Sequence, residues 1–358
     1  MVKILYRECR FRAALDMFRE IKPDIPESHV FNILGGIANS LYAFKIGKSV
    51  KVYILSGATE RLRLENFFDY YKLKHEKLKI KDFIYGDKDF VNNFYILPIM
   101  ATMINKYSFY DEDKNFLGFS FTMIDSYSEE ENKFYLDELN VLPYNFRDMR
   151  SDWIYARELE KLNDYQNELI GAYCVYKIRK EDFINNEIIN YYLSKKLKDL
   201  VIENIKNVLY GPYEKEKFSS VRGNLSYEYL IRHFIKLKNV LESDGNIKNY
   251  EGIMKYYKIQ VLYLRNLLLS GTDDFYRGEF IDTLVELNRL YPDFNIEDII
   301  EEWKKAAKLW RNIGRILMQL YIHISVENVD KLVNYINEIK GIEIPGFKKI
   351  LNKLELIN

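Results

Sequence analysis

The stretch Ser28–Gly47, with the sequence SHVFNILGGIANSLYAFKIG, decides the predicted fold of the first half of the chain. Ser28 is a suitable N-cap residue, because its hydroxyl can accept a hydrogen bond from a backbone N–H of the first helical turn. The apolar residues that follow cover most of the circumference of a helix, so they predict a buried central helix from about His29 to Phe44. Gly35 and Gly36 each lower helix propensity by about 1 kcal/mol and fit a helix against which another backbone packs closely.

The rest of the first half alternates between helical and strand patterns. A short helix is predicted at residues 9–21. The polar sequence SEEEN separates two of the predicted strands, which should therefore form a hairpin. These patterns predict an α+β domain over residues 1–180. Its predicted strands, rich in β-branched and aromatic residues, are residues 51–56, 119–127, 133–137 and 172–178.

Beyond residue 180, almost every segment has helical spacing. Trp303 and Trp310 lie seven residues apart on one apolar seam. The seam is too short for a free-standing coiled coil, so it belongs in a bundle. We therefore expect an all-helical domain over residues 181–358 with both tryptophans in its core. The predicted helices are residues 183–209, 226–241, 253–269, 296–324 and 325–339.

Composition and charge exclude several classes of protein. The chain has 358 residues, and its 53 Lys and Arg residues balance its 53 Asp and Glu residues, so the formal net charge is zero. Zero net charge argues against a nucleic-acid binder that neutralises phosphates and against a polybasic membrane-surface protein. The longest apolar run, residues 94–104, is shorter than the roughly 17–25 residues that a membrane-spanning helix needs.

The N-terminal sequence and the cysteines predict a cytoplasmic protein. Charged residues interrupt the N-terminal sequence MVKILYRECRFRAALDMF, which contains no apolar core of a signal peptide. The two cysteines, Cys9 and Cys174, cannot form a disulfide framework, which favours a reducing compartment. Both are weak candidates for a nucleophile. Cys174 lies within a predicted strand, and Cys9, although flanked by cations, has no His nearby in the sequence.

The sequence predicts neither a metal ion nor a cofactor. The four histidines, His29, His75, His233 and His323, have no second His or Cys within four residues, so zinc-ligand spacing is absent. The sequence YAFKIGKS (42–49) ends like a phosphate-binding loop but lacks the first Gly of that motif. His29 stands at the predicted helix start, where the helix dipole disfavours an imidazolium. A neutral site residue and a packed structural residue both remain open for it.

Six stretches distributed over the chain match the order of motifs in one protein family. Residues 28–47 resemble an opening in which a His-Cys pair starts the central helix, with Val30 in the place of the Cys. LGFSFTMIDSYSEEENKFYLDELN (117–140) resembles a Gly-His strand, with Phe119 in the place of the His, followed by a hairpin and a strand ending in Asp. The other matching stretches are WIYARELEKL (153–162), AYCVYKI (172–178), GTDDFYRGEFIDTL (271–284) and EEWKKAAKLW (301–310). Together they resemble the butirosin biosynthesis protein H family.

This resemblance implies a papain-like domain, related to cysteine peptidases, followed by a helical domain. Active members are similar to cysteine acyltransferases of natural-product assembly, such as nonribosomal peptide biosynthesis. They pass an acyl group from a carrier-protein thioester to an amine. The chemistry uses a Cys at a helix N-terminus, a His base and an acid or amide that orients the His. Here the Cys position falls on Val30, the His position on Phe119, and the orienting acid on Asp137, which is retained.

The resemblance therefore implies a catalytically degenerate protein, a pseudoenzyme. Val30 supplies no nucleophile and Phe119 supplies no base, so His29, Val30 and Phe119 are expected to line a ligand-binding site. Expected partners are an acyl or peptidyl carrier protein, a sister biosynthetic enzyme or a small acyl-amine ligand, and a homodimer is compatible with the sequence. Neither nucleic acid nor a membrane is expected. The alternatives are an active acyltransferase with a displaced catalytic residue and an unrelated helical interaction protein.

Overall fold

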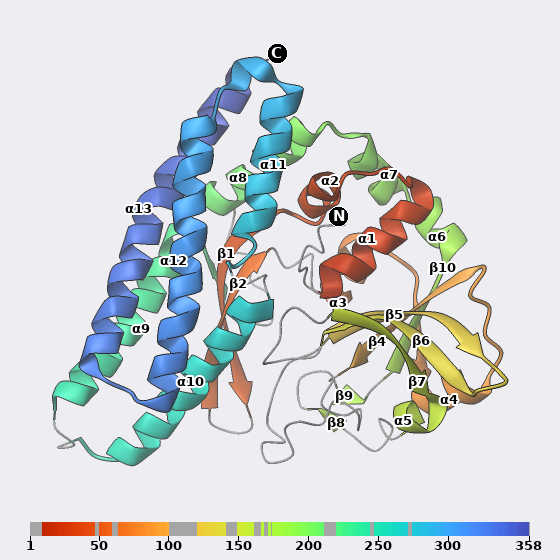
Figure 1. The fold of residues 1–358 in the computed structure, drawn as a ribbon, viewed down its shortest axis with the longest axis horizontal. Coiled ribbons are helices and arrows are strands. Elements are labelled where there is room, and N and C mark those ends of the chain that lie inside the picture. Colours follow the sequence, from red (N-terminus) through yellow and green to blue (C-terminus); the bar gives the residue numbers. More distant parts are fainter. Residues whose placement is uncertain are drawn as a thin grey trace. The chain divides into compact units, whose positions relative to one another are not determined.

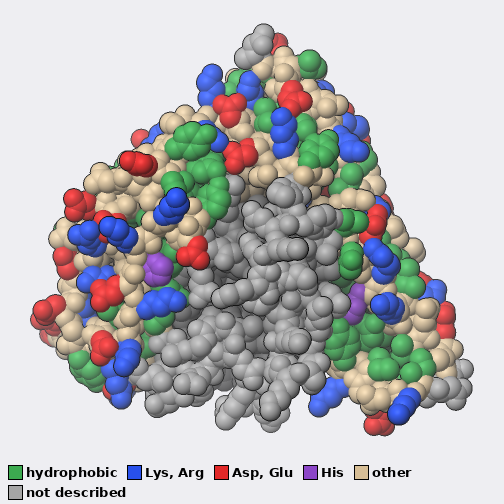
Figure 2. Space-filling view, turned by 180° about the vertical axis from the view of Figure 1, so that it is seen from behind, with side chains coloured by type: hydrophobic (Ala, Val, Ile, Leu, Met, Phe, Trp, Pro, Cys, Tyr) green, Lys and Arg blue, Asp and Glu red, His purple; other side chains and the backbone are tan. Residues whose placement is uncertain are grey.

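The computed structural model of the chain combines helices with antiparallel sheets, which is compatible with the predicted α+β class (Figure 1). Figure 2 shows basic and acidic side chains interspersed over one face, in keeping with the zero net charge. Among the described residues, no helix is both long and apolar enough to cross a membrane. The structure describes residues 9–46, 50–58, 64–99, 120–140, 149–160, 166–167, 171–172, 174–210, 220–243, 247–270 and 274–357.

The chain divides into two compact units, each built from two separate segments. Unit 1 contains Met1–Val30 and Glu60–Ser194, and unit 2 contains Phe31–Thr59 and Lys195–Asn358. This division differs from the single boundary predicted after residue 180. The difference arises because strand pairing joins the early segment of unit 2 to its later segment. Hydrophobic periodicity within one segment carries no information about such long-range pairing.

Unit 1 is built on a six-stranded antiparallel sheet with the strand order β3-β10-β4-β5-β6-β7. These strands are β3 (Glu76–Lys79), β4 (Asn93–Ile99), β5 (Ser120–Ser128), β6 (Lys133–Asn140), β7 (Met149–Tyr155) and β10 (Cys174–Arg179). A separate short ladder joins β8 (Gln166–Asn167) to β9 (Gly171–Ala172). The helices are α1 (Cys9–Ile21), α3 (Leu64–Tyr70), α4 (Ile80–Tyr85), α5 (Ala156–Glu160), α6 (Lys180–Ile184) and α7 (Glu187–Ser194).

Alternating side chains pack the two faces of this sheet against different helices. On one face, residues of β4, β6 and β7 form a buried cluster with Phe83 of α4 and Leu159 of α5. On the other face, Phe183 of α6 contacts Phe94 of β4 and Phe18 of α1 edge-on, at ring-centroid distances of 5.8 and 5.4 Å. Because both faces are buried, a one-residue slip in register would turn apolar side chains toward the wrong partners. The sheet is the core of unit 1.

Unit 2 combines a bundle of long helices with a three-stranded antiparallel sheet of strand order β11-β1-β2, which contacts α8, α9 and α10. Helix α13 contacts α8, α9 and α12, while α12 also contacts α10 and α11, and Figure 1 shows α9, α12 and α13 side by side. The strands are β1 (Ile37–Ile46), β2 (Val50–Ala58) and β11 (Ser220–Arg222). The helices are α8 (Leu197–Tyr210), α9 (Asn224–Glu242), α10 (Tyr250–Ser270), α11 (Arg277–Leu290), α12 (Glu297–Ile322) and α13 (Val326–Leu356).

The helix predicted from about His29 to Phe44 is wrong beyond its first turns. Helix α2 spans only Glu27–Ile33, and the chain continues as strand β1, which pairs with β2 and β11. Between them the chain turns at Gly35 and Gly36, whose φ angles are 97° and 64°. Glycine adopts these left-handed conformations readily because it has no Cβ. A short apolar run suits a buried strand as well as a buried helix, so the sequence pattern alone did not separate them.

A buried polar cluster of unit 2 fixes this turn. Asn204 of α8 donates from Nδ2 to the backbone oxygen of Asn32 at 2.9 Å. Asn32 in turn donates from Nδ2 to the hydroxyl of Thr283 at 3.1 Å. A Cβ built on Gly36 would lie 2.8 Å from Nδ2 of Asn204, so a side chain at this position would displace the amide. The glycine is therefore required by close approach as well as by its φ angle.

Most other predicted elements are confirmed. The helix predicted at residues 9–21 is α1, and the predicted hairpin is the β5–β6 pair. The helix predicted from residue 325 is α13, which continues to Leu356. The helix predicted for residues 183–209 is wrong as one element, because the chain forms α6, α7 and α8 there. The remaining confirmed elements are β2, β10, α9, α10 and α12.

Both tryptophans of the predicted seam are buried, which confirms their place in the core of unit 2. Trp303 and Trp310 are each 0% exposed. Trp303 contacts Phe280 of α11 and Phe347 of α13, with ring centroids 4.6 and 4.9 Å away. A Cβ built on Gly346 would lie 3.0 Å from Nε1 of Trp303, so the indole packs almost directly onto the backbone of α13. The seam therefore joins three helices.

Replacing Trp303 with Ala should lower the free energy of unfolding by about 3–5 kcal/mol, because it empties a large site in a packed core. Trp303→Phe is the matched variant. No described residue accepts a hydrogen bond from the indole N–H, so Phe loses packing volume but no hydrogen bond and should destabilise less. Urea unfolding followed by circular dichroism measures both. Wild-type stability in Trp303→Ala would contradict the packing described above.

Candidate functional site

Val30 is a buried residue of α2. The resemblance assigns this position to the nucleophile. The side chain of Val30 is 0% exposed. Helix α2 begins at Glu27, so Ser28 lies inside the first turn rather than before it. The backbone N–H of Val30 donates to the carbonyl of Pro26 at 3.2 Å. A thiolate is stabilised by unpaired N–H groups at a helix N-terminus, and the N–H at this position is already paired.

His29 precedes Val30 and is half-buried. No described residue forms a hydrogen bond with its Nε2 atom. Burial lowers the pKa of His29 below its ordinary value, and the nearby charge of Lys22 lowers this pKa further. The imidazole is therefore a neutral group at physiological pH. This agrees with both interpretations that the sequence left open, a neutral site residue and a packed structural residue.

Phe119, one of the three carried-over positions, lies outside the described residues. Asp137 of β6 lies opposite Met123 of β5. The role that the resemblance assigns to Asp137 stays a prediction.

Within the described β3–β10 ladder, no histidine lies opposite Cys174. Cys174 begins β10 and is half-buried, and it pairs with Lys79 of β3. The histidine nearest in this ladder is His75, which precedes β3 and lies four residues from Lys79. That separation is roughly 13 Å along the strand, too far for direct proton transfer between a thiol and an imidazole. His75 instead stacks on Phe68 at 4.4 Å. The side chain of Cys9, at the start of α1, lies outside the described residues.

The described residues also contain no cluster of metal-binding side chains. Among them, no three His, Cys, Asp or Glu side chains lie close enough together to hold a metal ion.

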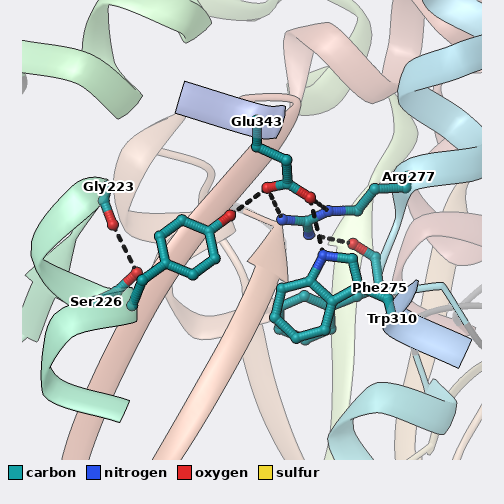
Figure 3. Close-up of polar contacts among 7 residues, drawn as sticks. Gly223, Ser226, Phe275, Arg277, Trp310 and Glu343 are labelled. Atoms are coloured by element: carbon teal, nitrogen blue, oxygen red, sulfur yellow. Dashed lines mark hydrogen bonds and ion pairs between the residues drawn. The ribbon is translucent and has the colours of Figure 1, made fainter. Parts of the chain in front are cut away.

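Unit 2 contains a buried polar cluster that the sequence patterns did not predict (Figure 3). It is centred on the carboxylate of Glu343 in α13, which faces the guanidinium of Arg277 at the start of α11. Arg277 donates from Nε to Oε1 at 2.7 Å and from Nη2 to Oε2 at 2.6 Å. Both side chains are 0% exposed. This bidentate geometry is the strongest form of an ion pair between these residue types.

Two further groups donate hydrogen bonds to the carboxylate of Glu343. Trp310 of α12 donates from Nε1 to Oε1 of Glu343 at 2.8 Å, and the hydroxyl of Tyr227 in α9 donates to Oε2. The third guanidinium nitrogen of Arg277 donates to the carbonyl of Phe275 at 2.6 Å. A carboxylate has about four lone-pair sites, and all of them are used here. The cluster is closed to additional ligands, so its arrangement serves structure rather than catalysis.

The charges of this cluster stabilise each other. Burial alone would lower the pKa of Arg277, yet the charge and hydrogen bonds of Glu343 raise that pKa above its ordinary value. Burial and the charge of Glu343 raise the pKa of Tyr227 well above 10, so its hydroxyl remains a donor. Desolvating an ion pair is expensive unless its geometry is nearly ideal and every remaining hydrogen-bonding group is satisfied. The contacts of Glu343 meet both conditions.

The same cluster holds the turn that precedes α11. Phe275 and Tyr276 have φ angles of 62° and 66°. These left-handed conformations are unfavourable for residues that have a Cβ. Asp274 accepts hydrogen bonds from the backbone N–H of Gly278 at 3.2 Å and from Arg311 at 2.8 Å. The Phe275 ring packs on Trp310 with centroids 4.8 Å apart. These contacts compensate for the backbone strain and set the start of α11.

One sequence signal could have located this cluster. In α13, Glu343 falls at the same three- and four-residue spacing as the buried residues Ile336, Ile339, Phe347 and Ile350. A carboxylate at a core position of a helix requires a buried cation or several donors. The prediction ended this helix at residue 339 and so did not include Glu343.

Neither a protein-family model nor a curated protein matches the chain.

His233 of α9 provides a pH-dependent prediction. Burial lowers its pKa from 6.5 to about 4, with a smaller contribution from Lys236. The folded state therefore favours neutral His233, and this stabilisation is present above pH 6.5 and lost as the pH falls toward 4. The shift corresponds to about 3 kcal/mol. Between about pH 7 and about pH 4, wild type should lose about that much more stability than His233→Gln, measured by urea unfolding. Parallel pH profiles would rule out the assigned burial effect.

Glu343→Gln should lower the free energy of unfolding by about 3–5 kcal/mol, because it leaves Arg277 as a buried cation without a counter-charge. The double variant Arg277→Met, Glu343→Gln removes both charges and keeps an amide oxygen as acceptor for Trp310. It should lose less than the sum of the two single variants. A double-mutant cycle of urea unfolding measures the difference. Additive losses would mean that the two side chains are not coupled.

Proposed function

We propose that the protein is a non-catalytic relative of the butirosin biosynthesis protein H family, whose active members are papain-like acyltransferases. In this proposal it binds an acyl or peptidyl carrier protein without transferring the acyl group. The observation that carries the proposal is the state of Val30, which stands where the resemblance requires a nucleophile and is completely buried in α2. An aliphatic side chain cannot attack a thioester, and Val30 has no exposed surface at which a substrate could reach it.

The chemistry of acyl transfer supports this reading. A thioester is attacked efficiently by a thiolate held beside a base. His29 could act as a neutral base, since burial and Lys22 lower its pKa, but its neighbour Val30 has no thiol. Cys174 has a thiol, but His75 lies roughly 13 Å further along the β3–β10 ladder. Base and nucleophile are therefore separated in each described case.

The papain-like fold is part of the proposal. The six-stranded antiparallel sheet of unit 1, with α1 against β5 and β6, supports an α+β domain of this kind. The proposal keeps His29 and Val30 in a helix, α2. It abandons the expectation that this helix continues to Phe44, because Ile37–Ile46 form a strand. The sequence match of the second half lies in unit 2, around the start of α11 and in α12.

The test uses an acyl thioester of N-acetylcysteamine, a small analogue of the carrier-bound substrate, together with an amine acceptor. Wild type should acquire no more covalent acyl adduct than the double variant Cys9→Ala, Cys174→Ala, because Val30 rather than a cysteine stands at the position of the family's nucleophile. Intact-protein mass spectrometry measures the adduct, and chromatography measures the amide product. Isothermal titration calorimetry with a phosphopantetheinylated acyl carrier protein should detect reversible binding by both proteins.

Two outcomes would contradict the proposal. A stoichiometric adduct on Cys9 or Cys174 that proceeds to the amide would establish an active acyltransferase with a displaced nucleophile. Absence of both an adduct and carrier-protein binding would remove the carrier protein as partner. A thiol that is labelled slowly without forming amide would match ordinary surface reactivity and would leave the non-catalytic assignment standing.

A further inference from the structure

Helix α12 carries a row of exposed cations on the side opposite its buried seam. Lys304, Lys308, Arg311 and Arg315 follow one another at four-, three- and four-residue spacing, and Lys305 lies beside them. All five side chains are exposed. At 1.5 Å per residue, the row from Lys304 to Arg315 extends over roughly 16 Å on one face of the helix. We call these five residues the α12 basic stripe.

Few carboxylates compensate this stripe. Lys304 pairs with Glu301 at 2.6 Å, and Arg311 pairs with Asp274 at 2.8 Å. Among the described residues, no carboxylate pairs with the other three cations, Lys305, Lys308 and Arg315. Because the whole chain has no net charge, this positive excess is a local feature rather than a consequence of composition.

Glu301 and Glu302 precede Lys304 and Lys305 at a favourable helical spacing, but the rest of the stripe is not explained by the stability of α12. Like charges four residues apart, such as Lys304 with Lys308 and Arg311 with Arg315, destabilise a helix. Cations favour a helix only within its last turn, where they face the negative end of the dipole, and all five residues lie before the last turn of α12, which ends at Ile322. A row of cations that opposes helix stability and remains exposed is suited to an anionic partner.

We propose that the α12 basic stripe is the docking surface for an acidic face of the carrier protein, and this inference rests on the proposed function. Charge complementarity argues for the assignment, since a row of exposed cations attracts an acidic surface of a partner and steers its approach. The seam residues Trp303 and Trp310 are buried, so α12 presents no apolar face that could enter a lipid surface. The partner is therefore recognised at its charged surface.

The experiment measures binding of a phosphopantetheinylated acyl carrier protein by fluorescence anisotropy. The test variant is Lys305→Gln, Lys308→Gln, Arg315→Gln, which removes three cations that have no carboxylate partner among the described residues. Its affinity should fall about tenfold, as expected for several charges at the edge of an interface. Wild-type binding should also weaken between about 0.05 M and about 0.5 M salt, and the variant should show a smaller salt dependence.

The matched control is Lys236→Gln, Lys255→Gln, Lys258→Gln, which removes three exposed cations from α9 and α10 of the same unit. It should bind the carrier protein like wild type. Circular dichroism should show both triple variants to be folded, because none of the six side chains is buried.

The outcomes separate this inference from the proposed function. Equal carrier-protein affinity of wild type and the stripe variant would overturn the docking surface while leaving the carrier protein as partner. Equal losses in the stripe and control variants would also overturn it, because the effect would then reflect net charge. Absence of binding by wild type would overturn both proposals. Stripe-dependent binding to anionic lipid vesicles or single-stranded DNA without carrier-protein binding would assign the stripe to another anion and overturn the acidic-protein assignment.

Discussion

The buried ion pair between Arg277 and Glu343 is the constraint on which the packing of unit 2 depends. Two charges without exposed surface have lost their hydration, so the arrangement is tolerable only while each donor reaches its acceptor. Helices α9, α11 and α12 each direct one side chain to the carboxylate on α13. None of these helices can slide along its neighbours without leaving a buried group unsatisfied. We interpret the pair as a determinant of one packing arrangement more than as a source of net stability.

The predictable part of the fold is the part whose signal lies within one segment. Helices α1, α9 and α12 followed from apolar residues at helical spacing, and the burial of Trp303 and Trp310 followed from their place on the same seam. Residues 37–46 were unpredictable for the opposite reason. An apolar run has no period that separates strand from helix, and the deciding features were the left-handed turn at Gly36 and its contact with Asn204, a residue far along the chain.

The candidate site divides in the same way. That Val30 cannot act as a nucleophile is evident from its chemistry, whereas its complete burial depends on packing that no local pattern records. The identity of Asp137 could be read from the sequence, but its pairing with Met123 depends on a register that shifts along the β5–β6 ladder. Glu343 stood at a core position of a helix, which predicts a buried partner for it. That the partner is Arg277 depends on how α11 approaches α13.

The discontinuity of unit 2 has a consequence for its synthesis on the ribosome. Strands β1 and β2 belong to unit 2, yet the chain of Glu60–Ser194 must be made before any of their helical partners exists. At 5–20 residues per second, that interval lasts roughly 7–27 s. During it the nascent β1–β2 segment has neither β11 nor α8 to cover it, while the whole chain of unit 1 is completed. The order of translation therefore completes the chain of unit 1 ahead of unit 2 and leaves the β1–β2 segment waiting for its partners longer than any other part of unit 2.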